Sequence, residues 1–277
     1  EIPKRDWSSD VCSSDLLHVP QTGIVDYPAM ARRLAEVVAA AGGEVRTSTR
    51  ALGLRDDGAG AVLETTGGEV RARTVVTCAG LQSDEMARRT DPGLDLRIIP
   101  FRGEYHELVP SARRLVRHLI YPVPDPAFPF LGVHFTRRVD GTVECGPNAV
   151  VAFAREGYRK SDVSAREIAG IVAWPGFRRV ARRYWRTGLG EYHRSFSRRA
   201  FVAALARLVP EIRVEDLRPA GAGVRAQACA RDGGLLDDFE IRHAGRVVHV
   251  CNAPSPAATA SLAIGDAIAS RVLESLH

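Results

Sequence analysis

The alternation of apolar and polar residues predicts a helix near the start of the chain and short strands after it. From Pro28 to Ala41 the apolar residues recur at helical spacing, with Asp26 as an N-terminal cap and Gly42-Gly43 as the stop. Strand-like stretches separated by turns follow, and the last is a hairpin return into a buried strand: Val45–Thr47, Leu52–Arg55, Ala61–Thr65 and Glu69–Cys78.

The rest of the chain alternates between sheet and helix patterns. Residues 98–150 alternate and turn like antiparallel strands, and residues 161–208 are helical with expected breaks at Pro175 and at Gly188–Gly190. The RVVHVC stretch at 246–251 predicts a strand, and residues 255–276 predict a closing helix. The pattern is therefore that of an α/β (α+β) protein.

Composition excludes some classes of function. A hydrophobic content of 45% with 26% charged residues is ordinary for a soluble globular protein. The net charge of +5 suggests an anionic partner, but the arginines are scattered and lysine occurs only at Lys4 and Lys160. The densest basic run, Arg178–Arg186, has helical spacing that could equally be a solvated face, so we expect no nucleic-acid partner.

The sequence carries no metal, hydrolase or membrane signature. Apart from Cys12, the cysteines stand alone in apolar or small-residue contexts, which favours reduced buried thiols in a cytoplasmic protein; they are Cys78, Cys145, Cys229 and Cys251. There is no G-x-S-x-G or H-E-x-x-H motif. No apolar run reaches the roughly 18–20 residues that span a bilayer.

The first residues do not fit the pattern that follows them. Residues 6–16 look like the conceptual translation of a common sequencing adapter, so we expect residues 1–16 to be an artefactual leader and the natural N-terminus to be missing. The alternative is a genuine Ser/Asp-rich disordered leader.

Irregular segments punctuated by Gly and Pro, and rich in Arg, Tyr and His, stand out. The clustering of Gly and Pro around His134 and Asn148 indicates a shaped site, because such residues fix or free the backbone where a ligand approaches. Together these segments resemble the L-2-hydroxyglutarate oxidase/dehydrogenase family of the FAD-dependent D-amino-acid-oxidase-like superfamily, from about Thr22 onwards; they are Ile98–Leu108, Tyr121–Val150, Ala222–Phe239 and Val250–Gly265.

The resemblance implies an FAD-binding domain of the D-amino-acid-oxidase/glutathione-reductase type, lacking its N-terminal βαβ unit, plus an antiparallel-sheet substrate domain with helices. We expect a partial FAD-binding domain at 17–97, the substrate domain at 98–221 and a return to the FAD-binding domain at 222–277. No G-x-G-x-x-G loop is present: the nearest match, Gly58–Leu63, lacks the third glycine and leads into a strand. In the family that loop lies at the extreme N-terminus.

Two segments are the expected cofactor contacts. The TCAG turn lets backbone approach the dinucleotide, and the helix after it would offer amides to a phosphate; the turn consists of Thr77, Cys78, Ala79 and Gly80. By resemblance, the second flavin-contacting element is the backbone around Ser255, Pro256, Ala257, Ala258 and Thr259. The alternative for that segment is a plain helix cap, with Ser255 followed by Pro256.

By resemblance, Arg225 holds the substrate carboxylate, because a guanidinium fork matches two carboxylate oxygens. Arg102 or Tyr105 would bind the second carboxylate of a dicarboxylic acid, and Asn148 is a further substrate contact. Arg102 and Glu104 share one face of the presumed strand while Tyr105 points to the other, so Arg102 could instead pair with Glu104.

His134 is the candidate base for taking the substrate hydroxyl proton, because histidine titrates near neutral pH. The alternative is a structural histidine. His249 is the second candidate, and a hydrogen-bonded core residue is the favoured interpretation for it.

The resemblance implies FAD-dependent oxidation of L-2-hydroxyglutarate to 2-oxoglutarate, with oxygen or a membrane quinone pool as electron acceptor. We expect a cytoplasmic location, or a peripheral one at the inner face of the cell membrane. The alternatives are another FAD-dependent oxidoreductase of a 2-hydroxy or 2-amino acid, and an inactive fragment that binds no flavin.

Overall fold

The described part of the chain begins with an amphipathic helix. The computed structural model describes residues 18–123, 132–253 and 256–274. Helix α1 (Tyr27–Ala40) confirms the predicted helix: the Asp26 carboxylate accepts a hydrogen bond from the Ala29 N–H, and the chain turns away at Gly42, where φ is +83°.

A three-stranded antiparallel meander follows α1. It consists of β1 (Ala51–Asp56), β2 (Ala61–Thr65) and β3 (Gly68–Ala72). The strand expected at Val45–Thr47 is wrong: this stretch carries no strand assignment, because no described strand pairs with its backbone.

A second sheet, in the order β10-β11-β4, brings distant parts of the chain together. Here β10 (Glu240–Ala244) and β11 (Val247–Asn252) form a hairpin, and β11 runs parallel to β4 (Val75–Thr77). Every residue of β11 is buried, which confirms the strand predicted from RVVHVC. Because β4 and β11 are parallel, the chain leaves both strands at the same edge of this sheet.

Two helices accompany the second sheet. The short α2 (Ser83–Ala87) follows β4, and α6 (Ser261–Glu274) follows β11. The prediction that the last helix begins at Ser255 is wrong: residues 256–260 form turns, closed by a hydrogen bond from the Ser261 N–H to the Ala258 carbonyl, and Ser255 itself lies outside the described residues.

The largest sheet is antiparallel, as predicted for residues 98–150, and two long strands run through it. Strand β5 (Leu96–Leu108) pairs along its length with β9 (Leu217–Ala230). The other strands of this sheet are β6 (His134–Arg137), β7 (Val143–Gly146) and β8 (Val150–Val151). Together with β5 they lie in the order β6-β7-β5-β8. The expected domain boundaries at 97/98 and 221/222 fall within β5 and β9, so that division stays a prediction.

Three helices cover one side of the large sheet: α3 (Ala165–Ala173), α4 (Pro175–Phe196) and α5 (Arg198–Leu205). The break at Pro175 is confirmed. The break at Gly188–Gly190 is wrong: α4 continues through both glycines, and packing against the sheet offsets their weak helix propensity, as the Tyr192 hydroxyl donates to the Val151 carbonyl at 2.9 Å.

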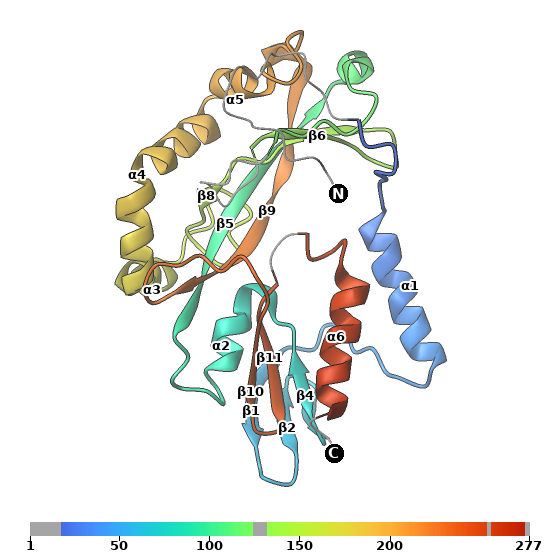
Figure 1. Cartoon of the computed structure of the whole chain (residues 1–277), viewed down its shortest axis with the longest axis vertical. Helices are drawn as coiled ribbons and strands as arrows, with labels where there is room; N and C mark the ends of the chain where they lie inside the picture. The colour runs from blue at the N-terminus through green and yellow to red at the C-terminus, as the bar shows by residue number, and fades with distance from the viewer. Residues whose placement is uncertain (1–17, 124–131, 254–255, 275–277) are drawn as a thin grey trace, which may run out of the picture.

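Figure 1 shows how these elements are arranged. Helices α3, α4 and α5 lie along the left of the β5–β9 ribbon, and the sheet of β4, β10 and β11 with α1, α2 and α6 forms the lower half. Both long strands extend from the upper half toward the lower half. They therefore run between the upper part of the large sheet and the edge where β4 and β11 end.

Candidate active site on the large sheet

One face of the large sheet brings together Tyr105, His134 and Arg225. In the strand register His134 lies opposite Gly146, and Tyr105 lies opposite Gly221. A methyl group at Gly146 would approach the Tyr105 Cδ1 atom to 3.4 Å, so the tyrosine ring borders that glycine. Arg225 is four residues beyond Gly221 on β9 and projects from the same face.

Glycines keep the space between these side chains open. A Cβ atom at Gly221 would have nothing within 4 Å, and one at Gly223 would meet only the Tyr105 Cε2 atom, at 4.0 Å. The face between Tyr105 and Arg225 is therefore bare backbone, which a small ligand can approach closely.

The hydrogen bond of His134 fixes which of its ring nitrogens carries the proton. Nδ1 lies 3.1 Å from the carbonyl oxygen of Gly132. A carbonyl can only accept, so Nδ1 carries the hydrogen in the neutral ring and Nε2 keeps a lone pair. Burial lowers the pKa of His134, against a smaller opposing effect of the Gly132 hydrogen bond. At neutral pH the imidazole is thus an uncharged proton acceptor.

Arg225 and Tyr105 are close enough to influence each other's ionisation. Burial lowers the pKa of Arg225, with the Tyr105 charge acting in the opposite direction. Burial raises the pKa of Tyr105, and the Glu144 charge adds to this while Arg225 opposes it. At neutral pH the pair presents a guanidinium cation and a neutral phenol, which is a suitable donor set for carboxylate oxygens.

Tyr121 also belongs to this site, although the sequence pattern did not single it out. Its ring stacks on that of His134 with centroids 4.2 Å apart and an angle of 18° between the planes. The signal was present, since Tyr121 begins the Pro-rich segment that contains His134, but its pairing opposite the histidine could not be derived from the sequence.

Arg102 lies away from this face, in the ion pair that was the alternative for it. Its side chain is 2% exposed, with Nη2 3.2 Å from Glu104 Oε1 and Nη1 donating to the Arg159 carbonyl. Arg102 and Glu104 lie on one face of β5 and Tyr105 lies on the other, as the alternation predicted. The guanidinium is engaged within the protein, so we no longer assign Arg102 to substrate.

Asn148 belongs to the same buried polar cluster. Its Oδ1 accepts a hydrogen bond from the Glu104 N–H at 2.7 Å, and its Nδ2 donates to Glu104 Oε2 at 3.2 Å. The Ser195 hydroxyl, from α4, donates to the other oxygen of Glu104. Asn148 therefore fixes the position of Glu104, and the structure does not bring it to the face of His134 and Arg225.

The two expected cofactor segments lie where the parallel strands β4 and β11 end. Gly80, with φ +52°, leaves its surroundings open, since a Cβ atom there would meet nothing within 4 Å. The expected burial of Cys78 is wrong: this residue follows the end of β4 and is exposed. The other described cysteines, Cys145, Cys229 and Cys251, are buried as predicted. An open glycine turn at the carboxyl end of a parallel strand fits the backbone approach of a dinucleotide.

His249 is a core residue, as favoured from the sequence. It is fully buried, with Nδ1 2.8 Å from the Thr77 hydroxyl and Nε2 2.7 Å from the Thr90 hydroxyl. The Thr77 hydroxyl is therefore already bonded within the protein. Of the second segment, the Thr259 hydroxyl is 2.7 Å from that of Tyr27, which joins the turn after β11 to α1.

The phosphate contact expected at the start of α2 stays a prediction, and the local charges do not favour it. This helix has five residues and begins with acidic side chains, and the Asp84 carboxylate is fully buried between Arg155 and Arg88. Burial alone would raise the pKa of Asp84, but hydrogen bonds and charges from these arginines outweigh it and lower the pKa. The acidic side chains in the first turn, Asp84 and Glu85, disfavour an anion there.

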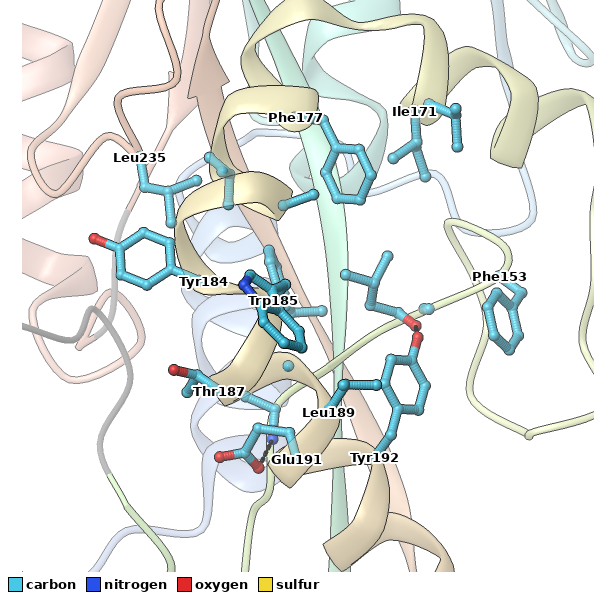
Figure 2. Close-up of a pocket in the computed structure, with 18 of the residues that line it drawn as sticks. Phe153, Ile171, Phe177, Tyr184, Trp185, Thr187, Leu189, Glu191, Tyr192 and Leu235 are labelled. Atoms are coloured by element: carbon cyan, nitrogen blue, oxygen red, sulfur yellow. Dashed lines mark hydrogen bonds between the residues drawn. The ribbon is translucent and has the colours of Figure 1, made fainter.

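An apolar pocket of about 420 Å³ lies between α3, α4 and the sheet. Figure 2 shows Phe177, Trp185, Leu189 and Tyr192 around it, with Glu191 among the few polar groups. None of Tyr105, His134 and Arg225 lines this pocket. Within residues 18–123, 132–253 and 256–274, no group of three or more His, Cys, Asp or Glu side chains could hold a metal ion.

The fold is that of a flavoprotein oxidoreductase. Among solved structures, the chain is similar to the L-α-glycerophosphate oxidase of Mycoplasma pneumoniae with FAD bound, at TM-score 0.60 and 17% identity, covering 84% of this chain and 52% of that one. It is also similar to the FAD complex of glycerol-3-phosphate dehydrogenase from Bacillus halodurans, at TM-score 0.51 and 16% identity, over 87% of this chain and 43% of the other.

The chain belongs to the FAD dependent oxidoreductase family, whose model matches residues 3–271. It is 52% identical to the L-2-hydroxyglutarate dehydrogenase of Indibacter alkaliphilus over 253 residues, covering 91% of this chain and 63% of that protein. Identity to the Escherichia coli protein of the same name is 44% over 257 residues, covering 92% and 61%. The chain thus spans about three fifths of the length of the curated relatives it matches.

Proposed function

We propose that the whole protein oxidises L-2-hydroxyglutarate to 2-oxoglutarate with FAD as cofactor. The observation that carries the proposal is the single sheet face on which a cation, a phenol and a neutral histidine surround bare glycine backbone. The curated relatives named L-2-hydroxyglutarate dehydrogenase, at 44–52% identity, support the choice of substrate.

In this proposal Arg225 binds the carboxylate next to the reacting carbon with two charge-assisted hydrogen bonds. The Tyr105 hydroxyl donates to the second carboxylate, which distinguishes a dicarboxylic acid from a monocarboxylic one. His134 takes the hydroxyl proton at Nε2, while its Nδ1–H stays bonded to the Gly132 carbonyl. Bound FAD supplies the oxidising chemistry by accepting the hydride from the α-carbon.

The residues proposed to hold FAD are backbone groups at the edge where β4 and β11 end. Thr77, Cys78, Ala79 and Gly80 supply one segment; Ser255, which lies outside the described residues, and Pro256, Ala257, Ala258 and Thr259 supply the other. Their N–H groups would interact with the flavin, and the open turn at Gly80 would let it come close. The residues present fit the flavin end of the cofactor, and the chain offers no Gly-rich diphosphate loop.

The electron acceptor is oxygen or a membrane quinone pool, and the location is the cytoplasm or the inner face of the cell membrane. Among the described residues, no helix is long and apolar enough to cross a membrane. Reoxidation of the substrate-reduced protein by oxygen, compared with reoxidation by a soluble quinone, distinguishes the two acceptors.

A panel of acids tests the substrate. The flavin-loaded protein is mixed with L- and D-2-hydroxyglutarate, L-lactate, L-malate and L-glutamate, and kcat/KM is measured for each. The proposal expects L-2-hydroxyglutarate to lead, since its two carboxylates engage Arg225 and Tyr105 and its hydroxyl offers a proton to His134, whereas L-lactate lacks the second carboxylate and L-glutamate carries an amine in place of the hydroxyl. A preference for L-lactate or L-glutamate would replace it with the second candidate, an oxidoreductase of another 2-hydroxy or 2-amino acid.

A further inference from the structure

Tyr121 and His134 lie directly opposite each other on adjacent extended segments. Ile120 and Phe135 exchange both backbone hydrogen bonds, at 3.0 and 2.9 Å, and form an isolated antiparallel bridge. The pair next to such a bridge is of the non-hydrogen-bonded kind, in which opposed side chains come closest. This explains why the rings of Tyr121 and His134 stack at 4.2 Å.

A second contact holds the tyrosine ring in place. The Tyr121 hydroxyl is 3.0 Å from the Thr136 hydroxyl, which lies two residues beyond His134 on β6 and on the same face. The tyrosine is thus anchored at both ends, by its own backbone and by Thr136. It lies flat over the imidazole even though it is 47% exposed.

These contacts restrict the imidazole in two ways. The terminal torsion of histidine is broad and roughly two-fold, so the ring needs outside contacts to fix its orientation. The Gly132 carbonyl fixes Nδ1, and the stacked ring of Tyr121 fixes the plane. Together they hold the ring with its lone pair on Nε2, the nitrogen that can accept a proton.

We propose that Tyr121 is a positioning residue for proton transfer: its ring holds the neutral His134 imidazole with Nε2 available on the face that carries Tyr105 and Arg225. The inference rests on the proposed function, because it requires His134 to take the substrate proton. Tyr121 itself does not need to touch substrate.

The charged and titratable groups nearest this face come from three strands and from the residue that follows β6. Arg138, directly after β6, is paired with Glu144 on β7 at 2.6 Å, so their charges offset each other. Tyr105 projects from β5 and Arg225 from β9. The pKa of His134 is lowered chiefly by burial, and the Tyr121 ring supplies part of that burial.

The test is an NMR titration of the eight histidine side chains of this chain. The His134 signal is assigned as the one that disappears in His134→Gln. In the unchanged protein His134 should titrate below 6.5 with its proton on Nδ1. Tyr121→Ala should raise the titration midpoint by about half a pH unit or more and mix the tautomers, because the ring loses cover. Tyr121→Phe keeps the stacking and should stay within about 0.2 of the original midpoint.

Tyr158→Ala is the matched control, because Tyr158 is 50% exposed and lies outside the site. In the flavin-loaded protein, Tyr121→Ala should move the acid limb of the kcat profile upward by the same amount and lower kcat about tenfold, with KM nearly unchanged. Thermal unfolding verifies that each variant is folded, and Tyr121→Leu replaces Tyr121→Ala if the latter is not.

An unchanged midpoint, tautomer and kcat profile in Tyr121→Ala, while His134→Gln abolishes turnover, would overturn the inference and leave the proposed function standing. Full turnover in His134→Gln would instead reject the proton step of the proposed function. The two failures are therefore distinguishable.

Discussion

His134 and Tyr105 border Gly146 on one face of the large sheet, and a methyl group at Gly146 would come within 2.7 Å of the Glu104 carbonyl oxygen and 3.4 Å of the Tyr105 ring. The φ angle of Gly146 is +135°, which other residues rarely adopt. Gly146→Ala should therefore lower the free energy of unfolding by about 2 kcal/mol or more, as measured by urea denaturation.

Gly188→Ala in α4 is the control for this substitution. An added Cβ atom there meets nothing within 4 Å, and alanine favours a helix by up to about 1 kcal/mol over glycine. The control should be neutral or stabilising. Equal stability of Gly146→Ala and the unchanged protein would contradict the close approach of β5 and β7.

A buried ion pair should connect the two halves of the structure. The Arg155 guanidinium donates to both oxygens of Asp84, at 2.7 and 3.0 Å, and joins the loop after β8 to α2. Arg155→Ala leaves a buried carboxylate with less compensation and should cost about 3–5 kcal/mol of unfolding free energy. Arg33→Ala, which breaks an exposed pair with Glu36, should change it by less than about 1 kcal/mol. Similar small losses for both would contradict the assigned role.

Kinetics should separate Arg225 from Arg102. Arg225→Ala removes the proposed carboxylate contact and should raise KM by about 10²-fold or more, while Arg218→Ala, near the start of β9, should leave KM unchanged. Glu104→Gln weakens the buried partner of Arg102 and should lower stability without changing KM. An unchanged KM in Arg225→Ala would refute its assignment to substrate.

The pH dependence of kcat/KM should report the neutral state of His134. A base accepts a proton only when it is unprotonated, so activity rises as pH increases through its pKa. Because burial lowers the pKa of His134 below its usual 6.5, the acid limb should have its midpoint below pH 6.5. His134→Gln should remove this limb, whereas His118→Gln at an exposed position should keep it. A limb that persists in His134→Gln would assign the base elsewhere.

Local signals in the sequence were sufficient for several elements. The Asp26 cap and the glycine stop defined α1, and the apolar run RVVHVC defined β11, because these depend on neighbouring residues only. Strand alternation also separated Arg102 and Glu104 from Tyr105. Resemblance to the family provided Arg225 and His134, which the register of the sheet places on one face.

Contacts between distant segments could not be derived in this way. The hydrogen bonds that Asn148 and Ser195 make to Glu104 depend on how β5 lies against these segments, and the path of α4 through Gly188 and Gly190 depends on packing against the sheet. The stacking of Tyr121 on His134 depends on a single backbone bridge between segments that the sequence pattern does not pair.

Anaerobic mixing of the whole flavin-loaded protein with L-2-hydroxyglutarate tests the central claim most directly. The account predicts that the flavin absorbance is bleached within one turnover by the L enantiomer, far more slowly by the D enantiomer, and more slowly in His134→Gln than in the unchanged protein. A flavin that stays oxidised in the presence of L-2-hydroxyglutarate would contradict it.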